Sequence, residues 1–137
     1  MIVKPERSGW RDEELSRRHR DWGANCPAID VDFLMIEYDT GHPSGIVEYK
    51  HERAAPQYPR HASYRAIKAL ADNSHIPFFV CRYSDDLTRY VVTPLNDYAE
   101  QLCNTRNTEM TEVEWVTLIY NMRGRSLPES VRVKLMR

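Results

Sequence analysis

The sequence predicts one α/β domain with a central mixed sheet, flanked by helices and followed by a helical C-terminal extension. Stretches with helical periodicity alternate with strand-like runs in the order αββαββ. The length of 137 residues is that of one ordinary domain, and 42% apolar with 28% charged residues is the balance of a soluble globular chain. We therefore expect residues 1–137 to form a single domain, with a core over residues 11–94 and a helical extension over residues 95–137.

The first part of the chain predicts a helix followed by a hairpin. Residues 11–22 place apolar side chains near one helical face and acids four positions before arginines, with the acids first, as the helix dipole favours. Two runs rich in β-forming residues follow, at residues 29–38 and 45–50. The turn-forming residues Gly41 and Pro43 lie between these runs, so we expect the two strands to pair.

A second helix and two further strands are predicted next. Residues 60–73 carry small and apolar side chains on one helical face and basic side chains on another. Residues 76–83 form a short continuous apolar run, which is typical of a strand covered on both faces, and Cys81 within it is expected in the core. Residues 89–93 predict a further strand.

Capping signals predict the helices of the C-terminal extension. Asn96 can cap a short helix, and Thr111 with Glu114 makes a capping-box pattern ahead of an apolar helical stretch. Gly124 can end that helix. Because Ser126 repeats the capping pattern before a short basic segment, we expect it to cap a last helix.

Composition excludes several classes of protein. A membrane-spanning helix needs about 20 consecutive apolar residues, and the longest apolar stretch, near residues 76–81, is far shorter. The charged N-terminus has no apolar signal region. The three cysteines are widely spaced and lack a partner pattern, which argues against a disulfide framework and a structural zinc site. We therefore expect a cytoplasmic protein without a membrane partner.

Charge is unevenly distributed along the chain. The net charge is −1, but residues 1–25 carry +1, residues 26–122 carry −6 and residues 123–137 carry +4. Of the 19 basic residues 15 are arginines, whose planar guanidinium suits phosphate contacts as well as surface ion pairs. An arginine-rich genome composition explains the same bias, so the arginines alone do not indicate a nucleic-acid partner.

Four charged side chains interrupt the apolar runs of the predicted hairpin. Asp30 and Asp32 fall in its first strand, and Glu48 and Lys50 fall in its second. Side chains two apart on a strand share a face, so the two pairs can converge on one side of the sheet. Carboxylates bind hard cations such as Mg²⁺, and a nearby lysine can activate water and offset phosphate charge, which predicts metal-assisted phosphodiester hydrolysis. The alternative is the polar face of an amphipathic sheet with an ordinary Glu48–Lys50 ion pair.

The string from Asp32 to the triplet Glu48-Tyr49-Lys50, with a helix before it and an αβ unit after it, resembles the PD-(D/E)xK nuclease superfamily. The resemblance is to its small Holliday-junction-resolvase-like and phage-encoded members, and it covers residues 11–94. It implies a restriction-endonuclease-like fold and a nuclease that depends on Mg²⁺ or Mn²⁺. It also implies that Asp32 and Glu48 are catalytic metal ligands, that the Tyr49 backbone carbonyl is a further ligand, and that Lys50 is the catalytic lysine.

The resemblance implies additional acids around this triplet. Asp30 stands two positions before Asp32, as a second acid does in resolvase-like relatives, and the first helix offers Glu14 or, in second place, Glu13. The chain departs from the name motif because Pro27 is not adjacent to the aspartate. We expect Asp32 rather than Asp30 to be essential, since it lies further into the predicted strand and in a drier position.

The expected substrate is nucleic acid, with DNA as the first expectation. A homodimer is the expected alternative to a single chain. An acidic metal site repels a polyanion unless cationic side chains lie beside it. We expect those cations from the predicted second helix and the basic tail: Arg60, Arg65, Lys68, Arg132 and Lys134. The alternative is a non-catalytic nucleic-acid-binding or protein-binding module on the same fold, which the helices over residues 112–136 and their basic tail would support.

Overall fold

The computed structural model describes residues 13–23, 29–55 and 61–136. The chain divides into two compact units, residues 1–30 and residues 31–137, and each is described by itself. The expectation that the whole chain forms one domain stays a prediction.

Helix α1 (Glu13–Asp21) lies in the first unit and confirms the helix expected there. The Glu14 carboxylate accepts hydrogen bonds from Arg17, at 3.2 Å, and from Arg18, at 3.3 Å. Bases fill the last turn, where they face the negative end of the helix dipole. These pairs are exposed, so they stabilise the helix only slightly.

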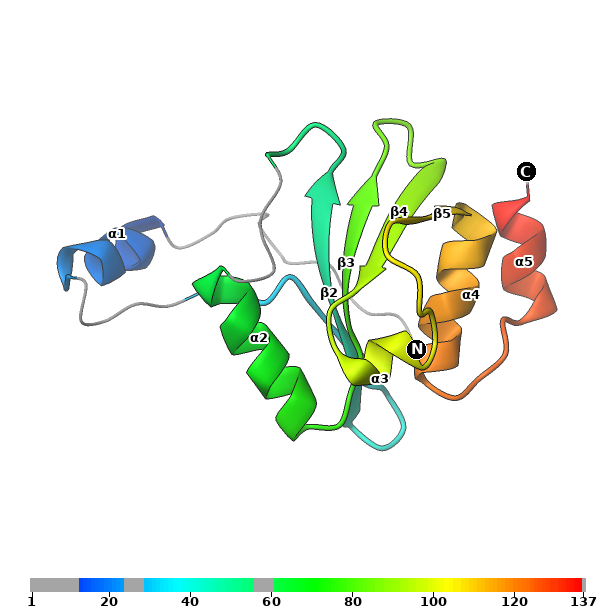
Figure 1. The fold of residues 1–137 in the computed structure, drawn as a ribbon, viewed down its shortest axis with the longest axis horizontal. Helices are drawn as coiled ribbons and strands as arrows, with labels where there is room; N and C mark the ends of the chain where they lie inside the picture. Colours follow the sequence, from blue (N-terminus) through cyan, green and yellow to red (C-terminus); the bar gives the residue numbers. More distant parts are fainter. Residues whose placement is uncertain (1–12, 24–28, 56–60, 137) are drawn as a thin grey trace. The chain divides into compact units, whose positions relative to one another are not determined.

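The second unit contains a five-stranded mixed sheet in the order β1-β2-β3-β4-β5. Strands β2 and β3 are parallel, and the other neighbouring strands are antiparallel. The strands are β1 (Phe33–Glu37), β2 (His42–His51), β3 (Phe78–Tyr83), β4 (Arg89–Pro94) and β5 (Thr108–Thr111). Helix α2 (Ala62–Asn73) connects the parallel strands (Figure 1). The predicted hairpin, the mixed sheet and the α/β class are confirmed.

The C-terminal extension is helical, as predicted. Its helices are α3 (Asp97–Glu100), α4 (Glu112–Met122) and α5 (Glu129–Leu135). The Asn96 side chain caps α3, and Thr111 with Glu114 forms the predicted capping box of α4. Gly124 follows the end of α4 with φ +67°, a conformation that glycine adopts without strain.

Two features of the extension differ from expectation. Pro128 rather than Ser126 stands at the N-cap of α5. No side-chain hydrogen bond caps this helix, because the proline side chain has no acceptor atom. Strand β5 is not predicted by the sequence. It is only four residues long and alternates exposed with half-buried side chains, which is too short a pattern to separate from a loop.

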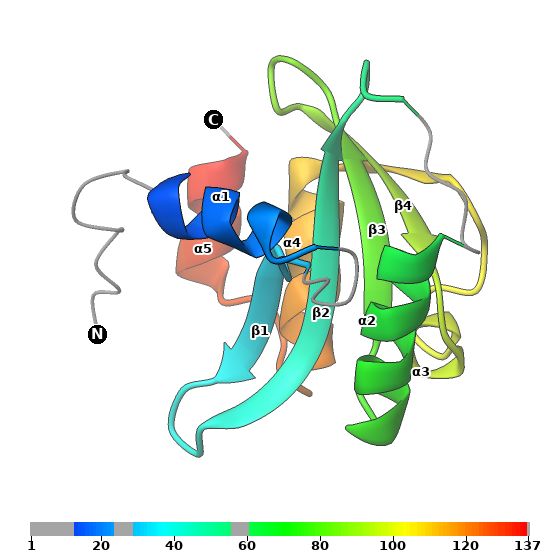
Figure 2. The same ribbon diagram turned by 90° about the vertical axis from the view of Figure 1, so that its left-hand side faces the viewer.

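The core consists of two apolar clusters on opposite faces of the sheet. Because side chains alternate along a strand, β3 contributes Phe78 to the cluster beside α2, and Phe79 and Cys81 to the cluster that contains Trp115 of α4. Figure 2 shows α2 and α4 on the two sides of the sheet. Strand β3 is therefore covered on both faces and Cys81 is fully buried, as predicted.

Strand β1 is shorter than predicted. Its first paired residue is Phe33, which lies opposite Val47 of β2, so residues 29–32 stand before the strand rather than in it. The expectation that Asp30 and Asp32 share a strand face is therefore wrong, since alternation holds only within a paired strand.

None of the described helices is long and apolar enough to cross a membrane.

Candidate active site

The structure brings Asp32 and Glu48 together at the start of β1. The antiparallel pairing of Phe33 with Val47 sets the preceding residue, Asp32, across from Glu48. The Asp32 N–H donates to Glu48 Oε1 at 3.2 Å, and the Tyr49 N–H donates to Asp32 Oδ2 at 3.1 Å. The Glu48 carboxylate is thus tied to the backbone of Asp32, 16 positions earlier, and the Asp32 carboxylate is tied to the backbone of Tyr49.

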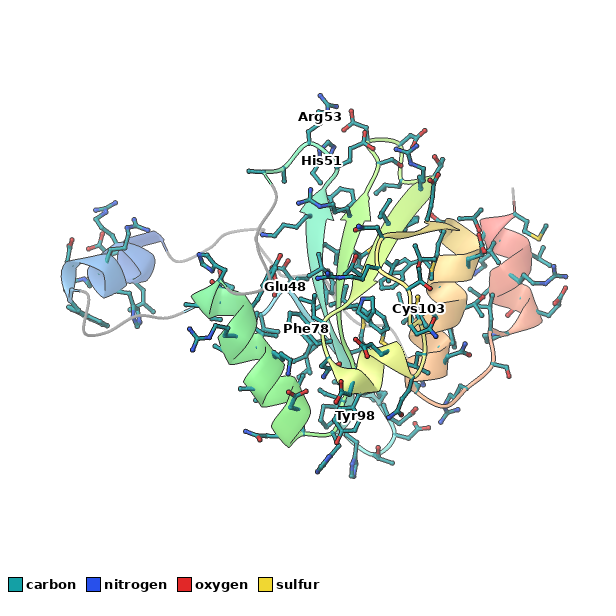
Figure 3. The ribbon with its side chains drawn as sticks, in the orientation of Figure 1. Glu48, His51, Arg53, Phe78, Tyr98 and Cys103 are labelled. Atoms are coloured by element: carbon teal, nitrogen blue, oxygen red, sulfur yellow. The ribbon has the colours of Figure 1, made fainter. Side chains whose placement is uncertain are left out.

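Glu48 is buried, with 6% of its surface exposed. It extends from β2 on the side of the sheet that α2 covers (Figure 3). Burial raises the pKa of Glu48 above its usual value, the Asp32 N–H lowers it, and the neighbouring Asp32 charge raises it again. One backbone N–H compensates the charge of this carboxylate only in part, and a bound cation would compensate it further.

Lys50 stands two positions after Glu48 on the same strand and therefore on the same face. Its side chain is half-buried, and its charge lowers the pKa of Glu48. Among the described residues Lys50 makes no ion pair within 4 Å, so the ordinary Glu48–Lys50 salt bridge is not formed. The ammonium group remains available to a ligand of the carboxylate pair.

Tyr49 separates Glu48 from Lys50, and its side chain extends to the opposite face. Trp115 Nε1 donates to the Tyr49 hydroxyl at 3.1 Å within the α4 cluster, and burial raises the pKa of Tyr49 to about 12. The side chain thus anchors β2, while its backbone stays beside the two acids. A cation between Asp32 and Glu48 could draw on the Tyr49 carbonyl as the resemblance implies.

The remaining predicted acids, Glu14 and Asp30, belong to the first unit, and their role as additional acids stays a prediction. The described residues include no cluster of three or more histidine, cysteine, aspartate or glutamate side chains suited to a metal. Two carboxylates nevertheless match the usual protein contribution to a Mg²⁺ site, which keeps waters and substrate oxygens as its other ligands.

Asp32 is exposed rather than buried, contrary to expectation. It stands before β1, where the sheet edge leaves it open on one side, and Glu48 supplies the drier position. The preference for Asp32 over Asp30 therefore depends on its hydrogen bonds with the Glu48 segment and not on burial.

The predicted cations do not form one patch. Arg65 and Lys68 are exposed on α2, where Lys68 Nζ lies 2.7 Å from Asp72 Oδ2. Arg132 and Lys134 are on α5, which packs against α4 on the other side of the sheet, and Arg132 pairs with Glu129. Arg60 lies outside the described residues. Sequence order does not reveal which side of a sheet a helix covers, and the part of the tail in nucleic-acid binding stays a prediction.

Two residues near the site were not predicted. Arg82 of β3 is in register with Lys50 of β2, and Tyr64 of α2 is 4% exposed. Burial raises the pKa of Tyr64. The charges of Glu48 and Asp32 also raise this pKa, and the charge of Arg82 lowers it. The sequence signal for Arg82 is a positive charge placed directly after the continuous apolar run of β3.

Comparisons with known proteins identify no relative of this chain: no family model matches it, and neither does any curated protein or solved structure. A function is therefore inferred from the geometry of the residues around Glu48.

Proposed function

We propose that the protein is a divalent-metal-dependent nuclease of the PD-(D/E)xK type, with a restriction-endonuclease-like fold, that hydrolyses phosphodiester bonds in DNA. The observation that carries this proposal is the contact between Asp32 and the buried Glu48, with Lys50, which has no ion-pair partner among the described residues, on the same face. An ordinary amphipathic sheet would pair Lys50 with a carboxylate and leave Glu48 in water.

The fold supports the same proposal. The acids lie on an antiparallel hairpin, β1 and β2, and helix α2 then leads to β3, which is parallel to β2. This is the αβ unit that the family pattern requires after the Glu-x-Lys strand. The unit sets α2 over the face that carries Glu48 and Lys50, which gives the site a wall on one side.

Each residue has a role in this mechanism. Asp32 and Glu48 would hold Mg²⁺ or Mn²⁺ together with the Tyr49 carbonyl, and the bound ion would polarise the phosphate and acidify a water molecule. Lys50 would orient the attacking water and offset the negative charge that grows on the phosphate oxygens. The Tyr49 N–H fixes the Asp32 carboxylate, and the Asp32 N–H fixes Glu48, so neither acid has to be ordered when substrate binds.

Cleavage of labelled nucleic acids tests the proposal. Purified protein is incubated with linear duplex, branched and single-stranded DNA and with RNA, in Mg²⁺, in Mn²⁺ and in chelator. We expect cleavage of DNA with metal only, and we expect Glu48→Ala to lower the rate by a factor of about 10² to 10⁴.

Glu100→Ala is the matched control, because this glutamate is exposed at the end of α3. It should cleave at the wild-type rate. Binding of DNA without cleavage under every metal condition would contradict the proposal and support the non-catalytic module instead. Cleavage that persists in chelator would also contradict it.

A further inference from the structure

Arg82 lies on the face of the sheet that carries the candidate site. Its Cα is in register with that of Lys50 on the parallel neighbouring strand, as Val80 is with Glu48. Side chains in register on neighbouring strands share a face, so Arg82 and Lys50 are side by side. Val80, two positions earlier on β3, packs against the α2 cluster, which identifies that face as the one beneath α2.

The Arg82 guanidinium is held by backbone carbonyls. Nη1 donates to the carbonyl of Ala54 at 3.0 Å, with a longer contact of 3.5 Å to that of His51, and Nη2 donates to the carbonyl of Ala55 at 3.5 Å. His51 is the last residue of β2, and Ala54 and Ala55 belong to the chain that leaves the strand. A guanidinium has five N–H donors, so these contacts fix its position without using its full capacity.

No carboxylate neutralises Arg82 within the described residues. Arg53 pairs with Asp85, Arg89 with Glu52 and Glu109, and Arg132 with Glu129. Arginines without such a partner in the described parts of the chain are Arg20, Arg65, Arg82 and Arg106, and of these only Arg82 is half-buried rather than exposed. A partly desolvated cation without a counter-ion is unfavourable unless an anion binds beside it.

We propose that Arg82 and Lys50 together form a phosphate-binding subsite for the nucleic-acid backbone. This inference rests on the proposed function and adds a residue to it. Two adjacent cations suit the two non-bridging oxygens of a phosphodiester, and the planar guanidinium of Arg82 can donate two parallel N–H bonds to them. Lys50 is two positions from Glu48 on β2 and in register with Arg82, so the subsite would bring that phosphate to the carboxylate pair.

Binding without metal tests the subsite separately from cleavage. The affinity of a fluorescein-labelled DNA duplex is measured in chelator between 50 and 200 mM salt for the wild-type protein, Arg82→Gln, Arg82→Lys and Lys50→Gln. Each phosphate contact adds about 0.9 to the slope of log affinity against log salt concentration for duplex DNA. We therefore expect Arg82→Gln and Lys50→Gln each to lower the slope by about 0.9, and Arg82→Lys, which keeps the charge, to retain it.

Arg106→Gln is the matched control, since this arginine also lacks a carboxylate partner among the described residues but is exposed in the connection from α3 to β5. It should keep the wild-type slope. A slope unchanged in both Arg82→Gln and Lys50→Gln would overturn the subsite, as would the absence of any duplex binding. Lys50→Gln keeps the test decisive if Arg82→Gln loses its fold, because the Lys50 side chain makes no hydrogen bond or ion pair with the described part of the chain.

The two proposals can fail separately. A reduced slope in a protein that never cleaves DNA would keep the phosphate subsite and reject the nuclease. Metal-dependent cleavage with unchanged slopes in the Arg82 and Lys50 variants would keep the nuclease and reject the subsite.

Discussion

Glu37 and Glu48 are two glutamates with little exposed surface, one at the end of β1 and one within β2, and they have opposite electrostatic surroundings. Arg123 and Arg125 each donate two hydrogen bonds to the Glu37 carboxylate, at 3.0 to 3.2 Å. Those bonds, from Arg123 first, lower the pKa of Glu37. Glu48 instead receives one backbone N–H, has the like charge of Asp32 beside it, and has its pKa raised by burial.

The difference separates a structural carboxylate from one that is available to a ligand. The guanidinium groups that hold Glu37 come from the end of α4 and the residues after it, so the cluster fastens the β1 edge to the extension. Glu48 has no arginine or lysine within ion-pair distance among the described residues, although Lys50 and Arg82 share its face. A protein that used Glu48 only for stability would be expected to surround it as it surrounds Glu37.

The largest effect we expect in this comparison is on stabilisation by metal. A ligand that binds only the folded state at 100 times its dissociation constant adds about 2.7 kcal/mol, which is a rise in Tm of about 10 °C for a domain of this size. We expect Mn²⁺ to raise the Tm of the wild-type protein and of Glu37→Gln, and not that of Glu48→Gln. A thermal scan with and without Mn²⁺ measures this, and an equal rise in Glu48→Gln would remove Glu48 from the metal site.

A smaller effect is expected on the pH dependence of stability without metal. An acid whose pKa is raised by folding stabilises the protein below its unfolded pKa, near 4.5 for Glu48, and this stabilisation is lost as the pH rises through the folded value. The wild-type protein should therefore lose stability relative to Glu48→Gln as the pH rises from 4 to 7, and the variant should melt at the higher temperature at pH 7. Denaturation curves across that range are the measurement; parallel pH profiles for the two proteins would show that burial does not perturb this carboxyl.

The smallest effect concerns the two arginines that hold Glu37. The Arg123 side chain is 26% exposed and that of Arg125 is 51% exposed, so water screens the second pair more strongly. We expect Arg123→Gln to lower Tm more than Arg125→Gln, and the difference to narrow in 1 M salt. If Arg125→Gln proves the more damaging, the exposed pair rather than the half-buried one fastens the edge of the sheet.

Local signals predicted most of the elements, because caps, turns and apolar periodicity act within a few residues. The capping box at Thr111 and Glu114 and the cap at Asn96 are examples. The pairing of Asp32 with Glu48 was also accessible, since a hairpin brings together residues a short distance apart in sequence. The start of β1 could not be predicted, because the apolar residues Ile29 and Val31 continue the strand pattern although the pairing with β2 begins only at Phe33.

Long-range pairings could not be predicted in the same way. Arg82 is in register with Lys50 only because the β2–α2–β3 crossover fixes a parallel pairing across 32 residues. Glu37 and Arg123 are 86 positions apart, and nothing near either one indicates the other. The tail cations Arg132 and Lys134 were expected at the site because charge can be read from sequence, whereas the side of the sheet that α5 occupies cannot.

The most direct test of the central claim is the rate of DNA cleavage by Lys50→Ala at saturating Mn²⁺, compared with the wild-type protein on the same labelled substrate. If Asp32, Glu48 and Lys50 form a nuclease site, the variant should keep its fold and its stabilisation by Mn²⁺ and lose cleavage by a factor of about 10² to 10⁴, because the metal ligands remain and the group that orients water and offsets charge is gone. Cleavage by Lys50→Ala at the wild-type rate would contradict the claim.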